Sequence, residues 1–193
     1  MPTVLSPHNA YENRTFPTQG VADLRGAQFE NCTFVEIDFS EATLQGAHFQ
    51  DCLFQRCDLS RANLTGAQIQ GVIFESCRLM GVNWSAAVGL LLAFHFVDCN
   101  AGFSIFHGVD LRGCQFSTSK LAQSDFQQSD LSGLSFEGCD LSGASFIGTR
   151  LHRADFSGAR GVFLEPARCA LKDTRLDMAS ALGVLAAQGI VMS

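Results

Sequence analysis

A five-residue repeat constrains the fold of this chain more than any other feature. From Phe106 to Phe156 every fifth residue is Phe or Leu, in strict alternation, and the residue two places before each is mostly small. A period of five matches neither the 3.6-residue period of an amphipathic helix nor the two-residue alternation of a half-buried strand. The repeat itself is therefore the unit from which the fold has to be inferred.

The repeat predicts a four-sided solenoid. If the large residue and the small residue two places before it both point inward, and the chain turns a corner after each repeat, four repeats close one coil. Coils then stack at about the strand spacing of 4.8 Å. We expect Phe116, Phe136 and Phe156 to stack in one column, and the alternating leucines, beginning at Leu111, to stack in the next. Large and small residues in each layer would then fill the core closely.

The repeat covers most of the chain and breaks once. Its register is unbroken up to Trp84, and it resumes at Phe96, which follows twelve residues later where ten are expected. We expect residues 1–176 to form one all-β solenoid with two stacks, at about 16–84 and 94–176.

The break, at Ser85–His95, has two interpretations. It is either a bulge that repacks against the rod or a loop that projects from a rigid scaffold and carries recognition. Exposed leucines in such a loop would be unusual without a partner to cover them. The candidate partner-binding residues of the loop are Leu90, Leu91 and Leu92.

The pattern changes again near the C-terminus. The last repeats are weaker, with Gly161 and Pro166 at central positions. After Leu176 the apolar spacing becomes helical, which predicts a short helix capped by Asp177 and stopped by Gly189. Such a helix either covers the open end of the core or pairs with a second chain, and we favour both roles for residues 177–193. The candidate dimerisation residues are Met178, Leu182, Leu185 and Ile190.

The eight cysteines follow the repeat. Each lies two residues before a central position, and no C-x-x-C spacing occurs. We interpret them as small, buried, free thiols and expect neither a disulfide nor a metal site. No cofactor is expected.

Composition and motifs exclude several classes of protein. The formal net charge of −6 argues against a protein that binds nucleic acid by neutralising phosphates. The N-terminal residues lack a secretory signal and no apolar run is long enough to span a bilayer, so we expect a cytoplasmic protein. Nucleotide-binding and zinc-protease motifs are absent and no catalytic constellation is visible, so we expect no enzyme.

Acidic residues recur at the outward positions of the second stack. One interpretation is a solvated surface, since Lys120, Arg150 and Arg160 interrupt the series. The other is a rod of regular negative charge, which would share the shape and the field of duplex DNA. The candidate partner-binding residues on this surface are Asp110, Asp125, Asp130, Glu137, Asp140 and Asp155.

The repeat of a small residue, any residue, Leu or Phe, and two further residues resembles that of the pentapeptide-repeat family over about residues 16–176. This resemblance implies a right-handed quadrilateral β-helix. The tail, residues 171–190, and the lead-in, residues 13–16, are similar to those of Qnr-type quinolone-resistance proteins.

The resemblance implies a DNA-mimicking homodimer, joined through its C-terminus, that binds DNA gyrase and/or topoisomerase IV. Such proteins protect these enzymes from poisons such as fluoroquinolones or albicidin, without binding nucleic acid themselves. The chain departs from the Qnr-type pattern because it offers one loop candidate where two are usual. The alternative is a scaffolding repeat protein with an unrelated protein partner.

Overall fold

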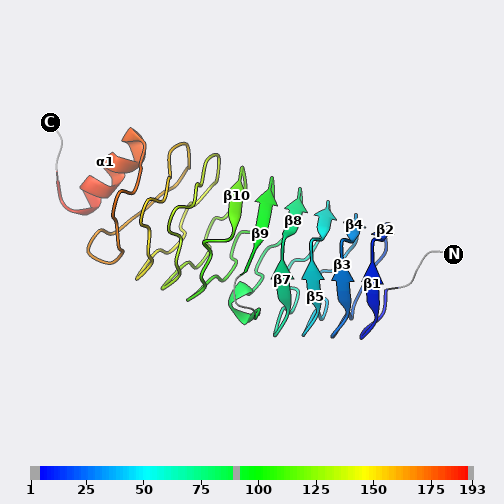
Figure 1. The fold of residues 1–193 in the computed structure, drawn as a ribbon. Coiled ribbons are helices and arrows are strands. Elements are labelled where there is room, and N and C mark those ends of the chain that lie inside the picture. The colour runs from blue at the N-terminus through cyan, green and yellow to red at the C-terminus, as the bar shows by residue number, and fades with distance from the viewer. Residues whose placement is uncertain (1–4, 89–91, 191–193) are drawn as a thin grey trace.

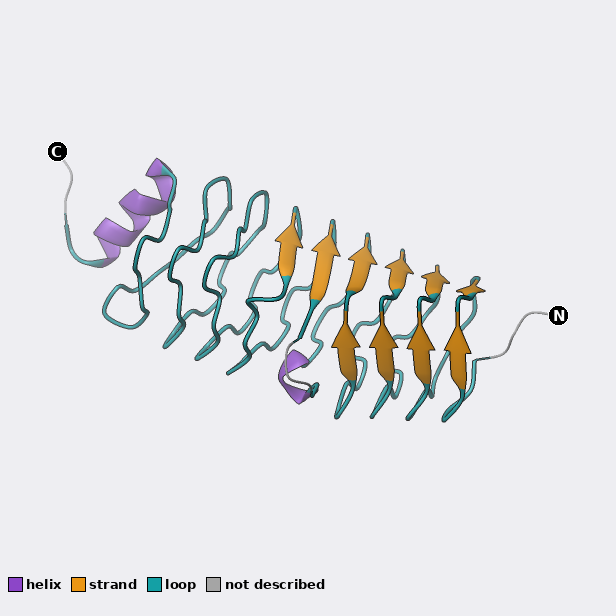
Figure 2. Ribbon diagram, in the orientation of Figure 1, coloured by secondary structure: helices purple, strands orange, loops and turns teal. Residues whose placement is uncertain are grey.

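The chain folds into a rod of stacked four-sided coils that ends in one helix (Figures 1 and 2). The computed structural model describes residues 5–88 and 92–190. Parallel strands form two sheets along the rod, in the orders β1-β3-β5-β7 and β10-β9-β8-β6-β4-β2. The elements are β1 (Ala10–Glu12), β2 (Thr15–Phe16), β3 (Gln28–Glu30), β4 (Thr33–Val35), β5 (His48–Gln50), β6 (Leu53–Gln55), β7 (Gln68–Gln70), β8 (Val72–Glu75), the 3₁₀ helix η1 (Trp84–Ala86), β9 (Phe94–Val97), β10 (Gln115–Ser117) and α1 (Met178–Ala187).

The strand register confirms the predicted coil. Phe34 pairs with Phe54, and Phe54 with Phe74, so equivalent positions are twenty residues apart. Single β-bridges continue the same step where the strands end, for example from Asp110 to Asp130. The predicted quadrilateral β-helix with a short C-terminal helix is therefore the fold of this chain.

Stacked phenylalanine rings fill the centre of the second stack as predicted. Phe136 and Phe156 stack with their ring centroids 5.0 Å apart. Phe106 and Phe126 form a second column, with centroids 4.8 Å apart. Rings of the two columns meet edge to face, as Phe126 and Phe136 do. In this arrangement aromatic pairs contribute energy beyond the burial of their area.

Positive φ angles at the corners allow the chain to turn between faces. Gly138 has φ +71°, and Thr118, at the same corner one coil earlier, has φ 48°. Most non-glycine residues adopt this left-handed region of backbone conformation at a cost in free energy. Glycine adopts it most readily, followed by asparagine and aspartate. These corners set the direction of the outward side chains described below.

The break between the stacks does not extend over the whole of Ser85–His95, because residues at both ends of this segment belong to the ladder. The coil-to-coil ladder continues to Val88, whose N–H donates to the Ala67 carbonyl at 2.8 Å, and Phe94 already pairs with Val72 in β8. The prediction for Leu92 is wrong, because its side chain is buried in the hydrophobic core. Leu90 and Leu91 lie outside the described residues.

The last coil departs from the predicted register. Gly161 and Pro166 are exposed and Leu164 is buried in their place. Glycine has no side chain to fill the core, and proline has no N–H for the ladder. Leu164 therefore supplies the apolar volume. Cys169, in the same segment, is only half-buried, whereas the other seven cysteines are buried as predicted.

The C-terminal helix begins and caps as predicted. Asp177 is the N-cap of α1, and its side chain accepts the Ser180 N–H at 2.8 Å. Among the helix residues whose burial the structure describes, Val184 is the buried one, and it joins the core at the end of the rod. Among the described residues no helix is both long enough and apolar enough to cross a membrane.

Candidate partner-binding surface

The five candidate aspartates lie on four separate ladders of the rod. Asp110 pairs with Asp130 on one ladder, and these are the only two of the set that the bridges bring together. Asp125, Asp140 and Asp155 each lie on a different ladder. The acidic side chains therefore surround the second stack instead of lining a single face.

Each of the five aspartates also closes the corner that follows it. The carboxylate accepts the backbone N–H two residues on, in the geometry of an Asx turn. The donor N–H groups and their distances are Arg112 to Asp110 at 3.1 Å, Gln127 to Asp125 at 2.8 Å, Ser132 to Asp130 at 3.0 Å, Ser142 to Asp140 at 3.0 Å and Ser157 to Asp155 at 2.9 Å. These residues thus have a structural role that the repeat pattern did not reveal.

Arginine side chains lie beside several of these carboxylates. Arg112 contacts Asp110 at 2.6 Å and Asp130 at 3.8 Å, and Arg150 contacts Asp130 at 3.6 Å. Hydrogen bonding from Arg112 lowers the pKa of Asp110. Burial raises the pKa of Asp130, but hydrogen bonds from Ser132 and the charge of Arg112 outweigh it, so the pKa falls below its ordinary value. Both groups are therefore ionised and partly neutralised by neighbours.

The other acidic residues differ in how openly they present their charge. Glu137 is exposed. Asp155 lies 3.5 Å from Arg175, and the hydrogen bonds from Ser157 lower its pKa. Asp140 lies between Lys120 and Arg160 on its ladder, and hydrogen bonds from Ser142 lower its pKa.

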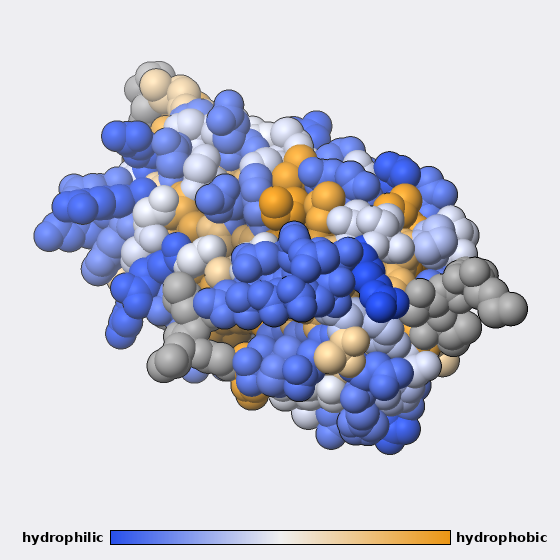
Figure 3. Space-filling model, turned by 45° about the vertical axis from the view of Figure 1, so that its right-hand side comes forward, coloured by the Kyte–Doolittle hydropathy of each residue, from blue (hydrophilic) through white to orange (hydrophobic). Residues whose placement is uncertain are grey.

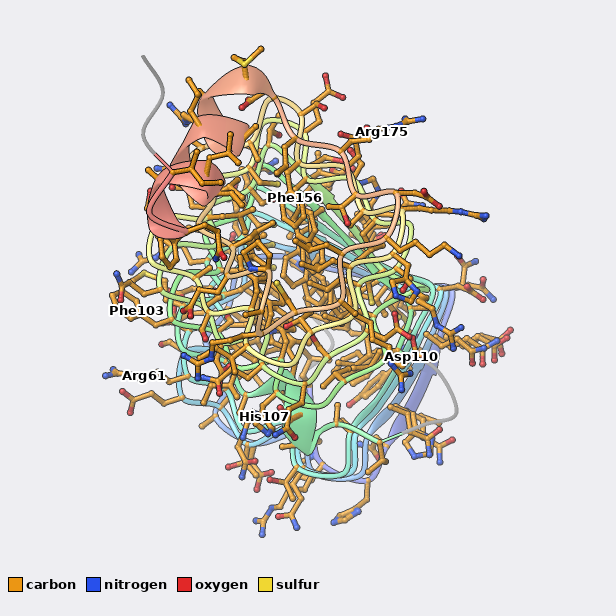
Figure 4. All side chains as sticks on the ribbon, turned by 90° about the vertical axis from the view of Figure 1, so that its left-hand side faces the viewer. Arg61, Phe103, His107, Asp110, Phe156 and Arg175 are labelled. Carbon is orange, nitrogen blue, oxygen red and sulfur yellow. The ribbon has the colours of Figure 1, made fainter. Side chains whose placement is uncertain are left out.

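The view along the rod separates core from surface. Phe156 lies in the interior, while Asp110 and Arg175 lie at the rim with their side chains outward (Figure 4). The surface seen in Figure 3 is mostly hydrophilic, with small apolar areas between the polar side chains.

Charge is unevenly distributed along the chain. Residues 141–193 contain four acidic and six basic side chains, although the whole chain carries a net charge of −6. The net negative charge is thus carried by the first 140 residues. A dimer joined at the C-terminal ends would place its least acidic segments at its centre.

The helix presents the apolar residues predicted for dimerisation. Met178, Leu182 and Ile190 are 76%, 39% and 49% exposed. Leu185 is half-buried and contributes less of its surface. Val184, which anchors the helix, was missed because α1 has apolar residues on all sides, so no single stripe marked its buried face.

No metal-binding group is found among the described residues, where no three His, Cys, Asp or Glu side chains converge to hold an ion.

Comparison with known proteins assigns the family. The model of the family described as "Pentapeptide repeat region" matches residues 22–100 and 47–126, and that of "Pentapeptide repeats (8 copies)" matches residues 119–158. No curated protein matches the chain. Two trypsin-treated forms of QnrB1, described as a plasmid-mediated fluoroquinolone resistance protein, are similar structures.

The first is 20% identical, with a TM-score of 0.78, and covers 97% of this chain and 91% of its own. The second is 20% identical, with a TM-score of 0.64, and covers 95% of this chain and 97% of its own. At this identity the likeness extends to the fold. The matches to the repeat models cover more than half of the sequence, and the chain therefore belongs to the pentapeptide-repeat family.

Proposed function

We propose that this protein is a homodimer that imitates duplex DNA, binds DNA gyrase and/or topoisomerase IV, and alters their response to fluoroquinolones. The observation that carries the proposal is the likeness of fold to QnrB1, which extends over 97% of this chain and so includes the C-terminal helix. The exposed carboxylates of the rod supply the negative charge that a DNA-binding surface would recognise.

The dimer interface of the proposal is the apolar row on α1. Met178 and Leu182 are exposed on the helix, and Ile190 is exposed just after it. A charge at Leu182 would be desolvated in such an interface but solvated in a monomer. We expect Leu182→Glu to give a folded monomer by light scattering, while Gln188→Glu, the same charge change at an exposed position of the C-cap, leaves the dimer intact. A monomeric wild-type protein at micromolar concentration would refute this part of the proposal.

The topoisomerase part is tested by activity and competition. Purified gyrase and topoisomerase IV are assayed for supercoiling and decatenation, with and without ciprofloxacin, as the protein is added. We expect the protein to change the drug response and to compete with linear DNA, with an affinity that falls as salt rises. No binding and no change in either activity at micromolar concentration would end the proposal.

The carboxylates are tested by substitutions that keep the corners closed. Asparagine retains the oxygen that accepts the backbone N–H, so Asp110→Asn, Asp125→Asn and Asp130→Asn together remove charge with little effect on stability. We expect this triple variant to bind the topoisomerase more weakly. The matched control combines Asp23→Asn, Asp38→Asn and Asp58→Asn, at the same repeat position in the first stack, where each side chain accepts the backbone N–H two residues on.

A scaffolding protein with an unrelated partner is the second candidate. It is favoured by the interruption of the acidic ladders, where Arg150 follows Asp130 and where Lys120 and Arg160 flank Asp140. It takes the place of the first proposal if the dimer forms but neither topoisomerase responds.

A further inference from the structure

One junction between regular coils of the second stack is open on a single face. The other face of this stack that lacks the corresponding bonds, between Phe146 and Glu165, lies in the last coil, which departs from the register. In the ladder pattern of this fold, the N–H of a central residue donates to the carbonyl of the next coil, as Phe136 does to Asp155 at 2.8 Å. Within the described residues, the corresponding bond from Phe116 to Ser135 is missing, and so are those from Ser135 to Cys114 and from Gly113 to Ser132. The six-stranded sheet also ends here, at β10 (Figure 2).

The other three faces of the same junction are closed. Phe106 donates to Asp125 at 2.7 Å, Leu111 to Asp130 at 3.0 Å and Leu121 to Asp140 at 2.8 Å. The gap is therefore not a general separation of the two coils. It is a seam, which we define as the space between residues 113–117 and 132–136.

The aromatic stack widens at the same place. The Phe116 and Phe136 centroids are 5.6 Å apart, compared with 5.0 Å for Phe136 and Phe156 in the next layer of the same column. The backbone and the core thus agree on a local opening.

The cause lies in the sequence at the small inward slot. The slot is filled by Cys114 in the coil before the seam and by Ala154 in the coil after it, but by Leu134 between them. The Leu134 side chain is buried, so its larger volume has to be accommodated inside the rod. Overpacking of a closely packed core moves the backbone. A groove of about 600 Å³ lies over the seam, lined by Cys114, Phe116, Leu134 and neighbouring residues.

We propose that this seam is a built-in hinge of the rod, at which the C-terminal coils and α1 tilt relative to the rest. Backbone hydrogen bonds join the two coils on three faces and hold the junction together. The fourth face has no such bonds to break when the seam widens. In a solenoid each coil contacts only its neighbours, so a weak junction divides the rod into two cooperative units. Tilting would change the angle between the N-terminal coils and any surface bound at the C-terminal end.

Amide hydrogen exchange, resolved by residue in the full-length protein, tests the hinge. We expect the amides of Phe116 and Ser135 to exchange on the order of tenfold faster, or more, than those of Phe136 and Asp155, which occupy equivalent positions one coil later. The amides of Phe106, Leu111 and Leu121 should remain protected, since they bridge the same junction on the closed faces. Equal protection of Phe116 and Phe136 would overturn the seam, and loss of protection on all four faces would overturn the hinge.

Two substitutions make the test specific to Leu134. Leu134→Ala copies the residue found at Ala154 and should slow exchange at Phe116 and Ser135 toward the rates of the next coil. Ala154→Leu is the reverse change and should speed exchange at Phe136 and Asp155. If Leu134→Ala does not fold, Ala154→Leu and the wild-type pattern still decide the question. Unchanged exchange in a folded variant would refute the assigned cause.

Discussion

Replacing Phe126 with alanine should be among the most destabilising single changes in this protein. The ring is fully buried and lies in a column between Phe106 and Phe146, with centroids 4.8 Å and 5.4 Å away. It also meets Phe116 and Phe136 edge to face at 6.2 Å. Truncation of a buried Phe typically costs about 3–5 kcal/mol, and more where the cavity cannot collapse. Here the backbone bonds on this column, Phe106 to Asp125 and Phe126 to Ser145, fix the layers in place. We therefore expect a loss of about 4–5 kcal/mol.

The assay is equilibrium unfolding in urea, followed by fluorescence of Trp84 and by circular dichroism, with thermal unfolding as a check. For a chain of this length a loss of that size lowers Tm by roughly 8–20 °C. Gln127→Ala is the matched control, because Gln127 is the outward neighbour and bonds through its backbone, where the N–H donates to Asp125 and the carbonyl accepts from Gly108. We expect the control to cost less than about 0.5 kcal/mol. Similar losses for the two variants would show that the inward and outward positions are assigned wrongly.

Three further predictions address the thiols, the corners and the helix cap. The seven buried thiols should react slowly with a water-soluble thiol reagent in native protein and quickly in urea, and the half-buried Cys169 should react first, as followed by mass spectrometry; burial raises the pKa of Cys52 and Cys114 to about 12, which suppresses their thiolates. Asp140→Ala, which loses the bonds from Ser142, should cost about 0.5–1 kcal/mol in urea unfolding, whereas Asp140→Asn should be nearly neutral at pH 7. Because the folded pKa of Asp140 is lowered, its charged form stabilises the protein above the ordinary aspartate pKa of about 3.9. That stability is lost as the pH falls through the folded pKa, a loss that Asp140→Asn should not show. Asp177→Ala removes the N-cap of α1 and should reduce helical circular dichroism before the β-helix melts, and an unchanged helical signal would contradict the capping role.

The repeat register allowed the fold to be predicted because most coils obey one simple rule. A large residue every fifth position specifies which side chains point inward, so the Phe116, Phe136 and Phe156 column followed directly from the sequence. The rule fails where a coil contains an exception. Leu92 was placed on the surface because its segment has no repeat character, but its side chain is buried.

The surface was predicted less well than the core, for a physical reason. Outward positions carry no packing signal, so the sequence shows that Asp110 and Asp125 are outward but not what they bond to. Their role in the corner turns could have been found, because an aspartate or asparagine one place before the centre recurs through the chain. The pairing of Asp110 with Arg112 could not have been found from the sequence, since it depends on how far the side chains reach in the folded rod.

The corner position explains how one fold can carry different surface charge. Asn63, Asn83 and Asn100 accept a backbone N–H two residues on, as the aspartates do, at 3.0, 3.1 and 3.4 Å. The turn requires an oxygen acceptor but not a negative charge, so the choice between aspartate and asparagine is nearly free for the fold. That choice sets the electrostatic field which a partner meets. Stability and partner recognition can therefore be varied separately in this protein, through the core positions for the first and through the corner carboxylates for the second.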